Sequence, residues 1–148
     1  MNLTKLALGA AAFMLVAGTL PAMAANFEVK MLNKGAAGAM VFEPDLVKIA
    51  PGDTVTFVPT DKGHDAQSIP DMLPAGAQPF KGEMSQPVTV TFDVPGAYGV
   101  KCAPHYGMGM VALVVVGDNP TNLDALKAVK QPKRPAERFE HLFEELEH

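Results

Sequence analysis

The segment KCAPHYGMGM, residues 101–110, contains the only cysteine of the chain together with a histidine and two methionines. Cys102 is followed by His105 three positions later and by Met110 five positions after that. Thiolate and thioether are soft ligands that hold Cu(I), and imidazole also supports Cu(II). The sequence has no C-x-x-C and no C-x-x-C-H, so it contains neither a thioredoxin-type dithiol nor a covalent haem attachment site. The spacing favours a metal-ligating loop.

A second imidazole is available far away in the sequence, because His64 lies in the motif DKGHD. Two imidazoles, one thiolate and one weak thioether are the ligand set of a blue-copper site. Alternatives remain on spacing alone: C-x-x-H also occurs in zinc sites, and a cysteine with a histidine nearby can be a nucleophile. Met108 competes with Met110 as the thioether. His141 and His148 lie in the tail, where we expect them to be solvated.

The elements that must position these residues are short strands. Alternating or continuous apolar runs are separated by Gly, Pro and Asp turns at the spacing typical of a β-sandwich. Residues 61–87 lack a clear period and predict a long connection that carries function. The expected strand regions are 27–32, 39–43, 46–49, 50–58 (a Pro-Gly-Asp turn and then a strand), 88–102 (two strands around Pro95-Gly96) and 110–116. The last is a continuous apolar run suited to burial on both faces.

The tail from about residue 119 to residue 148 predicts two short helices packed on the sandwich. Asn119 and Pro120 suit the start of the first helix. The second is expected to begin near Pro135. Its apolar residues recur at i, i+3, i+4 and i+7, which predicts one buried face: Phe139, Leu142, Phe143 and Leu146.

The first 24 residues have the pattern of a cleaved secretory signal. Lys5 precedes an apolar run of fifteen residues, and Ala22-Met23-Ala24 is a small-residue cleavage site. The run is short for a bilayer span. Residues 25–148 would then form a single domain with 11 basic and 16 acidic residues, a net charge of −5, which disfavours nucleic acid as a partner. In an oxidising compartment a solitary thiol is expected to be occupied.

The motifs GVKCAPHYGMGMV, PTDKGH, EVKMLNKG and MVFEP resemble those of the pseudoazurins, a family of periplasmic cupredoxins, over the whole of residues 25–148. The resemblance implies an all-β, eight-stranded Greek-key sandwich with one type 1 copper at one end and two C-terminal helices. It implies copper ligation by His64, Cys102, His105 and Met110, and so favours Met110 over Met108. It further implies a one-electron carrier of the periplasm, rather than an enzyme.

The resemblance also implies partners. Pseudoazurins pass electrons to periplasmic nitrite reductase, and a cytochrome or similar protein would be the donor. The exposed edge of His105 is the expected point at which the electron leaves. Pro104, Tyr106 and Met108 are expected around it. We expect a monomer that leaves the membrane once the signal is removed. The family carries a ring of lysines around this face, which would dock an acidic partner. The matching positions are Lys34, Lys62, Lys81 and Lys101.

Two positions depart from the usual pattern of the family. Asp65 stands where asparagine is usual, and Ala103 stands where threonine is common. An aspartate carboxylate can only accept hydrogen bonds, so we expect it to accept one from a backbone N–H near Ala103. Pro104 has no N–H to offer the sulfur and stiffens the loop.

Rival functions fit the residues less well. A copper storage protein would need exchangeable soft ligands, but the other methionines are scattered. An oxidase or reductase would need an open metal position or a second centre, and hence more histidines. A structural zinc site would not use methionine.

Overall fold

The chain folds into eight strands arranged as two four-stranded sheets. The spacing of the turns predicts the sandwich, and the resemblance implies the number of strands. The computed structural model describes residues 9–21 and 23–148. The strands are β1 (Asn26–Gly35), β2 (Gly38–Glu43), β3 (Leu46–Ile49), β4 (Thr54–Pro59), β5 (Gln67–Ser68), β6 (Val88–Thr91), β7 (Gly96–Lys101) and β8 (Val111–Val116). They are followed by the helices α1 (Leu123–Ala128) and α2 (Lys133–Glu147), and one turn of 3₁₀ helix, η1 (Tyr106–Met108), precedes β8.

The strand order brings the two ends of the cysteine-containing segment together. One sheet has the order β2-β1-β4-β6 and the other β3-β8-β7-β5, so the chain crosses between the sheets at every connection from β2 to β7, while β1–β2 and β7–β8 pair within a sheet. Strands β7 and β8 are antiparallel neighbours with Lys101 opposite Val111. Residues 102–110 therefore form a closed loop at one end of the sandwich.

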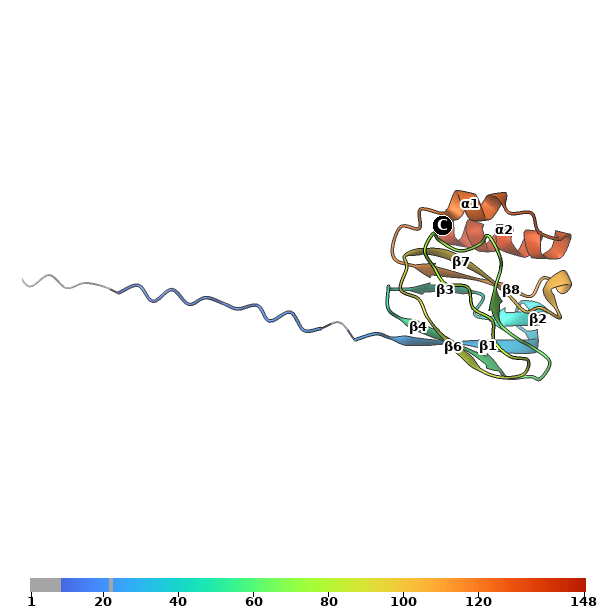
Figure 1. Ribbon diagram of the computed structural model, residues 1–148, viewed down its shortest axis with the longest axis horizontal. Coiled ribbons are helices and arrows are strands. Elements are labelled where there is room, and N and C mark those ends of the chain that lie inside the picture. Colours follow the sequence, from blue (N-terminus) through green and yellow to red (C-terminus); the bar gives the residue numbers. More distant parts are fainter. Residues whose placement is uncertain (1–8, 22) are drawn as a thin grey trace, which may run out of the picture.

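Strand β8 is buried on both faces, as its continuous apolar run predicts, because it lies between two hydrophobic cores. Ala112, Val114 and Val116 point into the core between the sheets. Val111, Leu113 and Val115 point into a second core beneath the C-terminal helices. The eight-stranded sandwich with two C-terminal helices is thus confirmed, and the helices cover the outer face of the sheet that contains β3, β8 and β7 (Figure 1).

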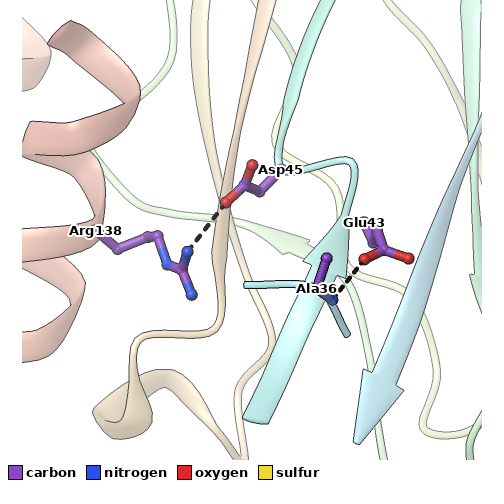
Figure 2. Close-up of polar contacts among 4 residues, drawn as sticks. All are labelled: Ala36, Glu43, Asp45 and Arg138. Atoms are coloured by element: carbon purple, nitrogen blue, oxygen red, sulfur yellow. Dashed lines mark hydrogen bonds and ion pairs between the residues drawn. The ribbon is translucent and has the colours of Figure 1, made fainter. Parts of the chain in front are cut away.

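Helix α2 packs through its predicted apolar face. Phe139, Leu142 and Phe143 are buried in the second core, with Leu146 half-buried beside them. An ion pair joins the same helix to the sheet, since Arg138 lies 3.4 Å from the carboxylate of Asp45 (Figure 2). Burial raises the pKa of Asp45, and the guanidinium of Arg138 opposes that rise. In the same view the backbone N–H of Ala36 donates to Glu43 across the β1–β2 turn, at 2.9 Å.

The first C-terminal helix begins later than predicted. We expected Asn119 and Pro120 at its start, but α1 begins at Leu123 with Asn122 as the preceding residue. The side chain of Asn122 instead accepts from the N–H of Ala97 at 2.7 Å and donates to the Ala97 carbonyl at 2.9 Å. This bridge to β7 holds the segment before α1 against the sheet. Helix α2 begins at Lys133, which places Pro135 in its first turn, where a missing N–H costs nothing.

The segment before β1 makes no part of the sandwich. Residues 9–21, 23 and 24 are exposed and form no helix or strand, and in Figure 1 the blue trace runs away from the domain. Part of the predicted signal, residues 1–8 and the cleavage-site residue 22, lies outside the described residues. Within the described ranges, no helix has the length and apolar character needed to cross a membrane.

Candidate metal centre

The loop from Cys102 to Met110 is held by its own backbone. The N–H of Cys102 donates to the carbonyl of Met110 at 3.1 Å, and the N–H of Met110 donates to the carbonyl of His105 at 3.3 Å. Between them, η1 ends at Gly109, whose φ of 91° is the left-handed conformation that favours glycine. A side chain there would also approach the Arg134 carbonyl to 3.3 Å. The loop is therefore folded back tightly and turns the side chains of Cys102 and His105 inward.

His64 reaches the same point from the long connection after β4. It is fully buried, and its carbonyl accepts from the N–H of Ser85 at 2.8 Å. Its Nε2 lies 2.8 Å from Oδ1 of Asn33 on β1. Because the Asn33 oxygen is an acceptor, it fixes the hydrogen on Nε2 and leaves the lone pair on Nδ1. Nδ1 is the atom that faces Cys102.

The three side chains converge as metal ligands do. The Sγ atom of Cys102 lies 3.7 Å from Nδ1 of His64 and 3.6 Å from Nδ1 of His105, and the three ligand atoms lie within 4.8 Å of one another. Two donors bound to one ion, sulfur at about 2.3 Å and nitrogen at about 2.0 Å, are themselves roughly 3.6–3.8 Å apart. The spacing of the donors thus fits a single shared ion. Copper suits this mixture of thiolate and imidazole.

The protonation states of the pocket suit a cation. Burial, and then the neighbouring His105, lower the pKa of His64, which favours the neutral imidazole that binds metals. Burial raises the pKa of Cys102, while the backbone N–H groups of Asp65 and His105 favour its thiolate. A bound cation would complete that ionisation, since metal binding and thiol deprotonation are coupled.

Asp65 joins the two ligand loops. Its Oδ1 accepts from the N–H of Ala103 at 2.7 Å, the contact expected from the sequence, and its Oδ2 accepts from Nε2 of Gln67 at 2.9 Å. The residue is buried. The two bonds tie the residue after His64 to the residue after Cys102, so they limit the movement of one ligand relative to the other.

The remaining predicted residues lie at or beside this centre. Met110 is fully buried, whereas Met108 is 45% exposed. Pro104 is exposed and Lys81 lines a shallow depression with Asp65 and Ala103. The other three lysines each adjoin a residue of the centre in the chain: Lys34 follows Asn33, Lys62 lies two residues before His64, and Lys101 precedes Cys102.

Sequence reasoning missed the residues that orient the ligands. Asn33 and Ser85 lie 31 and 21 positions from His64 in the chain, so no local pattern connects them to it. Tyr106 was expected beside His105, but the contact that holds it was not, because its hydroxyl donates to Gln131 just before α2. Its ring also lies under the Lys101 amine, 5.0 Å from the ring centroid. The motif DKGHD already offers the carboxylates of Asp61 and Asp65 as acceptors, so nothing in the sequence pointed to Asn33 as the partner of His64.

A two-sheet sandwich with a Cys–His–His cluster at one end, in which only His105 is partly exposed, defines a blue-copper protein, or cupredoxin. In agreement, residues 29–117 match the family model described as copper binding proteins, plastocyanin/azurin family.

Comparison with known cupredoxins shows to which family within that class the chain belongs. The chain is 54% identical over 133 residues to pseudoazurin of Paracoccus pantotrophus, covering 90% of this chain and 92% of that one. The structure of this chain is similar to that of pseudoazurin from Methylobacterium extorquens AM1, with 51% sequence identity and a TM-score of 0.80; the match covers 82% of this chain and 98% of that one. The structure of pseudoazurin from Hyphomicrobium denitrificans is also similar, with 46% sequence identity and a TM-score of 0.77; the match covers 81% of this chain and 97% of that one. The chain belongs to the pseudoazurins, and at that level it is a copper-binding electron carrier.

Proposed function

We infer that His64, Cys102, His105 and Met110 hold one type 1 copper and that the chain carries single electrons between redox proteins without catalysing a reaction of its own. The observation that carries this is the convergence of Cys102 Sγ and two imidazole Nδ1 atoms within 4.8 Å. Copper bound by these ligands can change between Cu(I) and Cu(II) with little rearrangement, since the soft sulfurs suit the first and imidazole suits both. Buried Met110, rather than exposed Met108, supplies the thioether.

The protein residues contribute rigidity and a route. Asn33 holds the ring of His64, and Asp65 holds the Cys102 loop, so the ligands keep one arrangement in both oxidation states. His64 is fully buried, whereas His105 is half-buried and adjoins the exposed Ala103 and Pro104. The edge of the His105 ring is therefore the point at which an electron leaves.

The compartment and partners follow from the N-terminal segment and the surface. Cleavage after Ala24 would release residues 25–148 into the periplasm as a single-domain monomer. We infer copper nitrite reductase as acceptor and a cytochrome or similar protein as donor. The exposed Lys34, Lys62 and Lys81 beside the centre support an acidic docking partner.

The function is tested by loading the exported protein with one equivalent of Cu(II). We expect an intense visible absorption band that a mild reductant bleaches reversibly. Reduced protein mixed with copper nitrite reductase and nitrite should regain the band as electrons leave. A weak, ordinary Cu(II) spectrum would contradict the ligand set; an intense band without reoxidation by the reductase would leave the carrier in place and exclude this acceptor.

The charge of Asp65 should tune the potential. Its carboxylate favours Cu(II), so Asp65→Asn is expected to raise the reduction potential. A unit charge several ångströms away is worth on the order of 2 kcal/mol at an effective dielectric constant of 20, or roughly 80 mV for a one-electron couple. Asparagine keeps an oxygen for the N–H of Ala103, and the Gln67 amide can turn to accept from it.

Voltammetry of the copper-loaded variants measures this shift. Asp118→Asn is the matched control, because Asp118 is exposed and follows β8 at the opposite end of the sandwich. It should leave the potential unchanged. An unchanged or lower potential for Asp65→Asn would show that the carboxylate does not act through its charge.

A further inference from the structure

The backbone nitrogen at which the folded domain begins lies against a buried carboxylate. The nitrogen of Ala25 is 2.8 Å from Oδ1 of Asp53, at the end of the sandwich remote from the metal centre. Asp53 is 7% exposed. The position of Ala25 is fixed independently of what precedes it, since its carbonyl accepts from the N–H of Thr54 at 2.9 Å and Asn26 pairs with Thr54 in the β1–β4 ladder.

The turn that contains Asp53 explains only half of its contacts. Oδ2 accepts from the N–H of Ala50 at 2.9 Å, which closes the Pro51-Gly52 turn in the way that aspartate commonly does. Oδ1 is directed instead at Ala25, 28 residues earlier. Asparagine or serine could have closed the turn without burying a negative charge.

That charge has no cationic side chain to balance it in the part of the chain that the structure describes. The three ion pairs there join Lys127 to Glu147, Arg138 to Asp45 and His141 to Glu144. Lys48 lines the same surface depression as Asp53 but forms no ion pair with it, and Asp118, which also lines the depression, is itself acidic. A buried carboxylate that lacks an opposite charge is costly.

We propose that removal of the signal segment creates the missing partner, because cleavage after Ala24 converts the Ala25 amide into an α-ammonium that forms an ion pair with Asp53. This inference rests on the proposed cleavage position. The peptide bond between Ala24 and Ala25 is hydrolysed, and the new amine takes up a proton at the nitrogen that already faces Oδ1. A hydrogen bond from a neutral amide to the carboxylate thereby becomes an ion pair, in which donor and acceptor are both charged.

The consequence is a domain that gains stability only after processing. The precursor, whose Ala25 nitrogen is an amide, has the hydrogen bond without the charge. The mature chain has both, so its β1–β4 edge opens less often. The edge formed by β1 and β4 is therefore most stable after cleavage.

The test compares four copper-loaded proteins in a cycle. One begins at Ala25, one carries Gly-Ser inserted before Ala25, and each is also made with Asp53→Asn. Hydrogen exchange at the Thr54 amide reports opening of the contact with Ala25. With Asp53 present, we expect the insertion to lower protection roughly fivefold, near the upper end of what a partly exposed ion pair contributes. With Asp53→Asn, the insertion should have no further effect.

Controls separate this pair from other causes. Asp118→Asn removes a charge from the same depression, and in that background the insertion should still lower protection. Should Asp53→Asn fail to fold, acylation of the α-amine at neutral pH decides instead: it should be at least several-fold slower for the chain that begins at Ala25 than for the extended chain. An equal loss of protection with and without Asp53, or equal acylation rates, would overturn the proposal. The mass of the exported wild-type protein tests the cleavage position separately.

Discussion

Cys102→Ala is expected to abolish the intense visible band of the copper-loaded protein completely. The band requires a bond between copper and a thiolate, and Cys102 is the only cysteine of the chain. His64 and His105 would remain, with their Nδ1 atoms still facing one space, so Cu(II) can still bind but with an ordinary, weak spectrum. In other metal sites, loss of a residue that hydrogen-bonds to a ligand lowers metal affinity by roughly 10–100-fold. Loss of the ligand Cys102 itself should lower copper affinity by at least that factor.

Absorption and electron paramagnetic spectra, with a copper titration, measure this result. Met108→Ala is the matched control, since Met108 lies in the same loop but is 45% exposed; it should keep the band and the affinity. Met110→Ala should keep a thiolate band with an altered spectrum, because thiolate and imidazoles remain. A band that survives Cys102→Ala would mean that the three side chains do not share a metal, and the electron-carrier mechanism would have to be abandoned.

The sandwich was predictable because its signals are local. A continuous apolar run at residues 110–116 requires two apolar layers, and the amphipathic stripe from Phe139 to Leu146 supplies the second of them. Turn residues mark the strand ends. The strand β5 was not predicted, since two residues, Gln67 and Ser68, pair with β7 only because the long connection passes along its edge. The predicted start of α1 was wrong because the side chain of Asn122 bonds to Ala97. No local capping pattern reveals this contact between distant residues.

The metal centre likewise has some residues that local sequence predicts and others that only the tertiary fold brings to it. Cys102, His105 and Met110 lie on one loop between two strands, so their spacing alone indicates convergence. His64 could be added because few histidines were available. The residue that fixes the ring of His64 comes from another element. Asn33 belongs to β1, and the pairing of β1 with β4 brings the end of β1 close to the segment that contains His64. The spacing of the residues therefore indicates Cys102 and the histidines, the choice of Met110 over Met108 rests on the resemblance, and the orientation of the ligands depends on the tertiary fold.

Charge reversal at Lys34, Lys62, Lys81 and Lys101 is expected to slow electron transfer to an acidic partner by about 10–100-fold at low ionic strength. An acidic protein with a basic face docks faster than its net charge suggests, because local charges steer the encounter. Lys81 lines a depression with Asp65 and Ala103, and the Lys101 amine lies 5.0 Å from the ring centroid of Tyr106. Lys34 and Lys62 are exposed and lie close in the chain to Asn33 and His64. The difference between wild type and variant should shrink as salt rises, since the screening length falls from about 30 Å at 0.01 M to roughly 8 Å at 0.15 M.

Stopped-flow reduction of copper nitrite reductase at several salt concentrations measures the effect, one lysine at a time and then together. Lys48→Glu is the matched control: Lys48 is exposed on β3 opposite Val115, at the end of the sandwich remote from the copper loop, and its reversal changes the net charge by the same amount. If Lys48→Glu slows transfer as much as the others, net charge rather than a docking face controls the encounter. If none of the reversals changes the rate at low salt, the lysines take no part in docking, and the contact must be made by the exposed apolar residues around His105, Met108 and Pro104 among them.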